Sequence, residues 1–115
     1  MKDYNILVID DEAAQRDVLT GYLKKKGYKL FSASSGKEGI GIARTNPVDI
    51  ILSDFKMPDL NGIEVLEQVK KINPEISFVI VTAYGTVENA VKAMRLGAFD
   101  YISKPVDLDE LDLMI

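Results

Sequence analysis

One stretch near the N-terminus, Tyr4-Asn5-Ile6-Leu7-Val8-Ile9-Asp10-Asp11, decides the fold class. Its apolar part is short and rich in β-branched residues, which is typical of a strand that is buried on both faces. Two carboxylates end the run, and from 12 to 26 the apolar residues recur at the three- and four-residue spacing of a helix. Gly27 predicts the end of that helix. A buried strand followed at once by a helix is the repeating unit of a parallel sheet.

The same alternation continues along the chain. Four more strands are expected, at 28–33, 48–53, 76–81 and 99–102, and a helical pattern follows each of them. The sheet is parallel because each helix returns the chain in a right-handed crossover, and the apolar strands need cover on both faces. We therefore predict an α/β fold: a doubly wound, three-layer sandwich with a five-stranded parallel sheet in the flavodoxin-like order 2-1-3-4-5. The last helix, which includes Leu108, is expected to be truncated.

Apolar side chains form stripes along the expected helices, and such stripes are typical of faces that pack against a neighbouring element. In the first helix the stripe consists of Ala14, Val18, Leu19, Tyr22 and Leu23. In the helix that Thr86 caps it consists of Val87, Ala90, Val91 and Met94, and in the final helix of Leu108, Leu111 and Ile115. Ser34 and Ser35 offer cap oxygens to the second helix.

Composition excludes several classes of function. The length of 115 residues suits one domain, 1–115, and the chain has no Cys and no His. These absences exclude a disulfide framework, a structural zinc site, a cysteine nucleophile and a Ser-His-Asp triad. The net charge of −4 argues against direct nucleic-acid binding. No apolar run approaches the ~20 residues that span a bilayer, and no signal peptide is apparent, so we expect a cytoplasmic protein without a membrane contact.

Carboxylates lie where two neighbouring strands of the predicted sheet end. Asp10 and Asp11 follow the first strand and Asp54 follows the third, so these side chains should converge at one edge of the sheet. With no imidazole or thiolate in the chain, Mg²⁺ is the expected occupant. Thr82 and Lys104 follow the fourth and fifth strands and add a hydroxyl and an ammonium. Each residue alone fits a turn, a cap or a surface charge, but their joint placement suits phosphoryl transfer.

Four motifs stand at the carboxyl ends of the expected strands: Ile9-Asp10-Asp11-Glu12, Asp54-Phe55-Lys56-Met57-Pro58-Asp59-Leu60-Asn61-Gly62, Val81-Thr82-Ala83 and Lys104-Pro105. Together they resemble the receiver domain of two-component response regulators. The resemblance covers essentially the whole chain. It implies a phosphorylation-controlled switch module of a two-component system, which assists its own phosphorylation and dephosphorylation and is not otherwise an enzyme.

The resemblance also implies a role for each residue of the pocket. Asp54 would accept the phosphoryl group from a sensor histidine kinase. Asp11 and Asp54 would bind Mg²⁺ directly, together with the backbone carbonyl of Lys56. Asp10 would act on the ion mostly through water.

Further residues would respond to the phosphoryl group or control its lifetime. Lys104 would contact the phosphoryl oxygens, with a cis peptide bond to Pro105 after it. Thr82 would be the switch hydroxyl, which also contacts the phosphoryl group, and Tyr101 would be the switch aromatic. The residues expected to tune autodephosphorylation are Lys56 and Tyr84.

A narrower resemblance concerns the output of the switch. The stretches 82–87 and 93–101 resemble NtrC-type receivers, which usually precede a sigma-54-activating ATPase module and a DNA-binding module. The face formed by the helix at 87–96, the strand at 99–102 and the final helix is the expected output surface and the expected interface of a homodimer. A transcriptional output domain outside this chain would then carry the response.

Several alternatives remain open at this point. The chain could be a stand-alone receiver or a phosphorelay intermediate. An aspartate-nucleophile phosphatase of haloacid dehalogenase type is disfavoured, because Asp10-Asp11-Glu12 lacks the DxD spacing of that family. A flavodoxin-like carrier of FMN is disfavoured, because two aspartates stand where its phosphate-binding loop would be.

Overall fold

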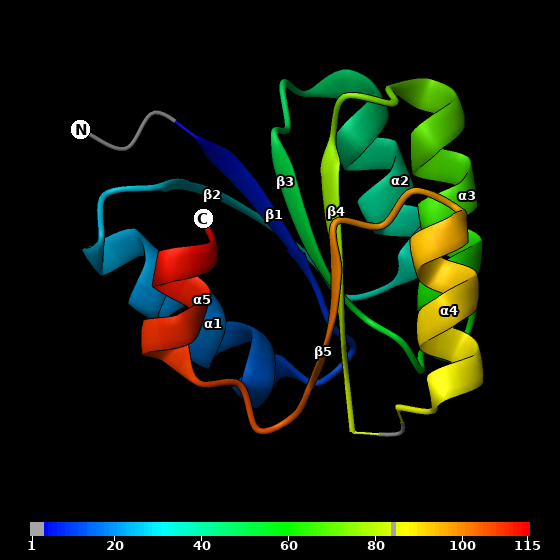
Figure 1. Cartoon of the computed structure of the whole chain (residues 1–115). Coiled ribbons are helices and arrows are strands. Elements are labelled where there is room, and N and C mark those ends of the chain that lie inside the picture. The colour runs from blue at the N-terminus through cyan, green and yellow to red at the C-terminus, as the bar shows by residue number, and fades with distance from the viewer. Residues whose placement is uncertain (1–3, 84) are drawn as a thin grey trace.

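The computed structural model describes residues 4–83 and 85–115. Strands and helices alternate along this part of the chain (Figure 1). Their bounds are β1 Asn5–Ile9, α1 Ala13–Lys25, β2 Lys29–Ala33, α2 Gly36–Thr45, β3 Ile50–Asp54, α3 Gly62–Ile72, β4 Ser77–Thr82, α4 Val87–Arg95, β5 Asp100–Ser103 and α5 Leu108–Met114.

The strands form a parallel sheet in the order β2-β1-β3-β4-β5, which confirms the predicted topology. Figure 1 shows α1 and α5 on one face of the sheet and α2, α3 and α4 on the other. The strand order reverses between β1 and β3, so their carboxyl ends lie side by side at the point where ligands bind in such sheets.

Two apolar cores lie on the two faces of the sheet. Alternate residues of β1 serve both, since successive side chains of a strand point to opposite faces. Leu7 and Ile9 belong to the core beneath α2 and α3, whereas Ile6 and Val8 belong to the core beneath α1 and α5. This burial on both faces explains why the central strands contain uninterrupted apolar runs.

The strands differ from the sequence-based bounds in a way that matters for the site. β3 is shifted to Ile50–Asp54 and β4 to Ser77–Thr82, so Asp54 and Thr82 are the last residues of their strands. Asp54 pairs in register with Val81 of β4. Both side chains are therefore fixed by the sheet and are buried.

The apolar stripe of α4 is not its buried face. Val87, Val91 and Met94 are 82%, 43% and 48% exposed, and Ala93 is the buried residue of this helix. A small side chain at the contact lets α4 lie close to the edge of the sheet, and the larger apolar residues then face outward. In α1, Leu19 and Leu23 are buried as expected, but Val18 is 60% exposed.

The predicted caps agree with the structure. Ser35 accepts a hydrogen bond from the Glu38 amide at the start of α2, and Thr86 accepts one from the Asn89 amide at the start of α4. Leu111 is buried on the inner face of α5. Within the described residues, no helix combines the length and the apolar character that crossing a membrane requires.

Candidate functional site

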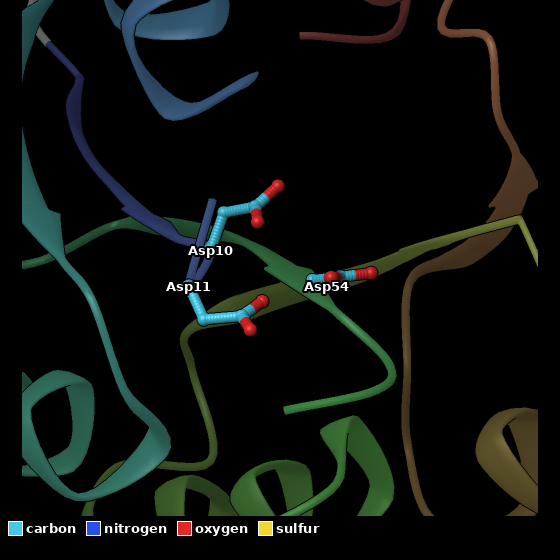
Figure 2. A group of neighbouring side chains, drawn as sticks. All are labelled: Asp10, Asp11 and Asp54. Carbon is cyan, nitrogen blue, oxygen red and sulfur yellow. The ribbon is translucent and has the colours of Figure 1, made fainter. Parts of the chain in front are cut away.

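Three carboxylates meet at the carboxyl ends of β1 and β3. Figure 2 shows Asp10 and Asp11 after the end of β1 and Asp54 at the end of β3, on neighbouring strands. One carboxylate oxygen from each lies within 4.8 Å of the others. Asp10 and Asp54 are buried, at 3% and 8% exposure, while Asp11 is exposed. The convergence predicted from the sequence is therefore present.

Backbone amides orient the two buried carboxylates. The Glu12 amide donates to Asp10 Oδ1 at 2.9 Å, and the Phe55 amide donates to Asp54 Oδ1 at 2.9 Å. Phe55 directly follows β3, and Glu12 lies between the end of β1 and the start of α1, so in both places the chain that leaves the sheet donates back to the carboxylate. The side chains are thus held in place before any ligand arrives.

Lys104 brings a positive charge to the same place. Its Nζ lies 3.4 Å from Asp54 Oδ1 and 3.6 Å from Asp10 Oδ2. The Lys104 amide donates to the Thr82 carbonyl at 2.9 Å, which joins the end of β5 to the end of β4. The peptide bond between Lys104 and Pro105 is cis, as the resemblance implies.

The pKa of Asp54 reflects a competition between burial and charge. Burial raises it, the Lys104 ammonium lowers it, and repulsion from Asp10 raises it again; the net result is a pKa above the ordinary 3.8 of aspartate. One ammonium balances only one of the three carboxylates. A divalent cation among these oxygens would offset the remaining repulsion, and an all-oxygen donor set fits Mg²⁺.

A pocket of about 540 Å³ opens above the carboxylates. Lys56 and Met57 of the loop after β3 line it, together with Ala83 after β4. The Lys56 side chain is exposed, and its expected effect on dephosphorylation stays a prediction. The expected role of Tyr84 lies outside the described residues.

Thr82 and Tyr101 lie close together behind the pocket. Thr82 is fully buried, and burial raises the pKa of the Tyr101 phenol, whose oxygen is also buried. A Cβ placed on Gly85 would lie 3.3 Å from Tyr101 Cε1 and 3.5 Å from Thr82 Cγ2. The two residues expected to form the switch therefore both lie next to Gly85.

Sequence reasoning missed two supports of the site. Arg16 Nη1 donates to the backbone carbonyl of Asp10 at 2.7 Å and so holds the turn after β1 against α1. Asn61 and Glu64 form a capping box that fixes the start of α3. The Asn61-x-x-Glu64 spacing is legible in the sequence, but a lone arginine on a helix gives no such signal.

Gly62 is required where α3 begins beneath the site. A Cβ at this position would lie 2.9 Å from the Asp54 carbonyl oxygen and 3.1 Å from Phe55 Cα, both backbone atoms. We expect Gly62→Ala to lower the free energy of unfolding by about 1–3 kcal/mol, the usual cost of overpacking. Urea unfolding measures this change.

Gly21 provides the matched control for Gly62. It lies within α1, and a Cβ there meets nothing within 4 Å. Gly21→Ala should raise stability by about 0.5–1 kcal/mol, since alanine favours the helix. Unfolding midpoints that rise for both variants would contradict the crowding assigned to Gly62.

Comparison with known families and proteins gives matches that cover nearly the whole chain. A family model described as response regulator receiver domain matches residues 6–115. The transcriptional regulatory protein ZraR of Escherichia coli (strain K12) is 39% identical over 107 residues, which are 93% of this chain and 24% of that protein. The chain thus spans about a quarter of the length of this regulator. Sporulation initiation phosphotransferase F of Bacillus subtilis is 35% identical over 96% of this chain and 90% of its own length.

Solved structures have the same fold. A CheY-like receiver domain protein from Methanospirillum hungatei aligns with a TM-score of 0.93 and 34% identity, over 96% of this chain and 88% of that one. A receiver from Burkholderia pseudomallei, described with a phosphorylated aspartic acid and a calcium ion, has a TM-score of 0.91 at 25% identity, over 97% and 66%. A beryllofluoride-activated NtrC4 receiver domain dimer has a TM-score of 0.89 at 28% identity, over 95% and 90%.

Proposed function

This chain belongs to the response regulator receiver family, and from that premise we propose that Asp54 is its phosphoacceptor in a Mg²⁺-dependent reaction. As a receiver, the domain is a signalling module rather than a true enzyme. The observation that carries the proposal is the position of Asp54, which is buried at the end of β3 beside Lys104 and two further carboxylates.

The geometry supports a direct transfer. A carboxylate oxygen of Asp54 forms a bond to phosphorus while the bond from phosphorus to the donor's nitrogen or oxygen breaks and its electron pair leaves with the donor. Lys104 opposes the effect of burial on the Asp54 pKa and can pair with the phosphoryl oxygens. Asp11, Asp54 and the Lys56 carbonyl would hold Mg²⁺, with Asp10 acting through water. When bound, the ion offsets charge on the transferring oxygens.

Intact-mass measurement tests this proposal. The purified chain is incubated with phosphoramidate, with Mg²⁺ in one sample and excess EDTA in the other. We expect the mass of one phosphoryl group to be added only with Mg²⁺. Equal labelling in EDTA would overturn the metal requirement, and continuous turnover of phosphate esters would favour the phosphatase alternative.

We infer the partners of the domain from its family and from the exposed apolar residues of α4. The family implies a histidine kinase as phosphodonor, and we place this exchange in the cytoplasm. The similarity to NtrC-type regulators supports a transcriptional output domain. The exposed Val87, Val91 and Met94 of α4 support a homodimer through α4, β5 and α5, and the solved NtrC4 receiver is described as a dimer.

Thr82→Ala is expected to separate phosphorylation from signalling. In the proposed switch, the Thr82 hydroxyl contacts the phosphoryl group, and the Tyr101 ring responds to its movement. The variant should accept the phosphoryl group but lose a coupling free energy of about 1–3 kcal/mol between Asp54 and the output face. The measurement is the set of chemical-shift changes caused by beryllofluoride along 87–96 and 99–102, in wild type and variant. Identical changes in the two proteins would refute the coupling.

A further inference from the structure

The loop from 55 to 61 connects the phosphoacceptor strand to α3, and backbone hydrogen bonds hold its two ends. The Phe55 amide donates to the Val81 carbonyl at 3.3 Å, and the Gly62 amide donates to the Phe55 carbonyl at 2.7 Å. Between these ends the loop passes the N-terminus of α2. A contact made there sets the path of the residues that follow Asp54.

Asp59 makes that contact. Its carboxylate accepts hydrogen bonds from the Gly36 amide at 3.1 Å and from the Lys37 amide at 2.8 Å. These are the first two amides of α2, which have no acceptor within the helix itself. Burial acts to raise the pKa of Asp59, but the hydrogen bonds from Lys37 and Gly36 outweigh it, and the pKa lies below the ordinary 3.8. The carboxylate is therefore charged at neutral pH, which suits the positive end of a helix.

Packing strengthens the same junction. A Cβ on Gly36 would lie 3.0 Å from Leu60 Cβ and 2.9 Å from Val65 Cγ2, so the backbone of α2 lies directly against the loop and α3. Met57, two residues before Asp59, is buried. Burial of Met57 before Pro58 and the hydrogen bonds of Asp59 after it thus hold the loop in place on both sides of the proline.

The N-terminus of α2 has its own cap as well. Ser35 accepts from the Glu38 amide at 3.1 Å, and the Ser35 carbonyl accepts from the Gly39 amide at 3.0 Å. Asp59 is different because it comes from more than twenty residues away along the chain. Its hydrogen bonds satisfy the helix and also tie the loop to it.

We propose that Asp59 is a positioning residue for the cation site. By tying the loop to α2, it fixes the backbone of Lys56 and Met57, and so keeps the Lys56 carbonyl in place as a ligand. This inference rests on the proposed function, which assigns that carbonyl to Mg²⁺. Asp59 itself does not enter the pocket, and its effect is exerted through the loop.

The test compares three variants by NMR. Asp59→Ala removes the tie, Asp59→Asn keeps one acceptor oxygen, and Ser35→Ala removes a cap of α2 without touching the loop. Mg²⁺ is titrated into each protein and followed by the amide shifts around Asp11 and Phe55. We expect about tenfold weaker Mg²⁺ binding for Asp59→Ala, a typical effect of losing a support of a metal ligand. Asp59→Asn should be intermediate, and Ser35→Ala should bind like wild type.

A second readout needs no metal. Backbone relaxation of amides 56–58 should show increased motion in metal-free Asp59→Ala and not in Ser35→Ala. Equal Mg²⁺ affinities in Asp59→Ala and wild type, or equal losses in Asp59→Ala and Ser35→Ala, would reduce Asp59 to a helix cap and overturn the proposal. If wild type shows no response to Mg²⁺, the proposed function fails, and the relaxation data alone decide whether Asp59 holds the loop.

Discussion

Asp54→Asn is expected to abolish phosphorylation of the domain. The amide has nearly the shape of the carboxylate but lacks its charge and its nucleophilic oxygen, so no bond to phosphorus can form. The variant should keep the hydrogen bond from the Phe55 amide, because an amide oxygen also accepts. Incubation with phosphoramidate and Mg²⁺, followed by intact-mass measurement, should show no added phosphoryl group. Unfolding in urea should show that the fold is retained.

Asp49→Asn is the control for this experiment. Asp49 is exposed and directly precedes the first residue of β3, so it lies at the end of the strand opposite to Asp54. It accepts a hydrogen bond from the Asn5 amide. The same chemical change there should leave phosphorylation at the wild-type level. Stoichiometric phosphorylation of Asp54→Asn would show that another residue accepts the phosphoryl group.

The sheet and the pocket were predictable because both depend on local signals. Each buried strand is an unbroken apolar run, and each helix between strands forces the parallel order. Once that order is known, Asp10 and Asp54 must meet, whatever their separation in sequence. The position of Lys104 after the fifth strand then added an ammonium to the predicted site, and this ammonium lies 3.4 Å from Asp54 Oδ1.

Features that depend on how elements pack against each other were not predictable in this way. The stripe of α4 has the spacing of a buried face, yet Val87 and Met94 are exposed because small Ala93 makes the contact. The tie from Asp59 to α2 joins residues that no short pattern relates. In a turn-rich segment next to a proline, an aspartate is indistinguishable by sequence from an ordinary turn former.

Lys104→Met is expected to slow phosphorylation by about 10²–10³-fold, the usual cost of losing one group that stabilises developing charge. Methionine retains the length and the apolar stem of lysine but lacks the ammonium. The phosphoryl oxygens then lose a positive partner that lies beside the acceptor. The rate with phosphoramidate and Mg²⁺, followed by intact mass, measures the effect. Lys26→Met is the matched control, because Lys26 pairs with Asp112 at 3.9 Å on the surface. This substitution should leave the rate of phosphorylation unchanged and should change the free energy of unfolding by no more than about 1 kcal/mol.

The same variant separates the two roles of positive charge in the pocket. Without Mg²⁺, Lys104→Met leaves Asp10 and Asp54 without their shared ammonium. The free energy of unfolding of the variant at neutral pH should therefore be about 1–3 kcal/mol lower than that of wild type. The loss is smaller than for a fully buried ion pair, because the pocket is open to water. We expect Mg²⁺ to bind the folded variant more tightly than folded wild type, because the Lys104 ammonium no longer competes with the ion for the carboxylates. The ion should therefore restore more stability to the variant than to wild type. Phosphorylation should stay slow even at saturating Mg²⁺, because the ion offsets repulsion among the carboxylates but does not replace the ammonium at the phosphoryl oxygens. Full recovery of the rate by Mg²⁺ would show that Lys104 serves only to balance charge.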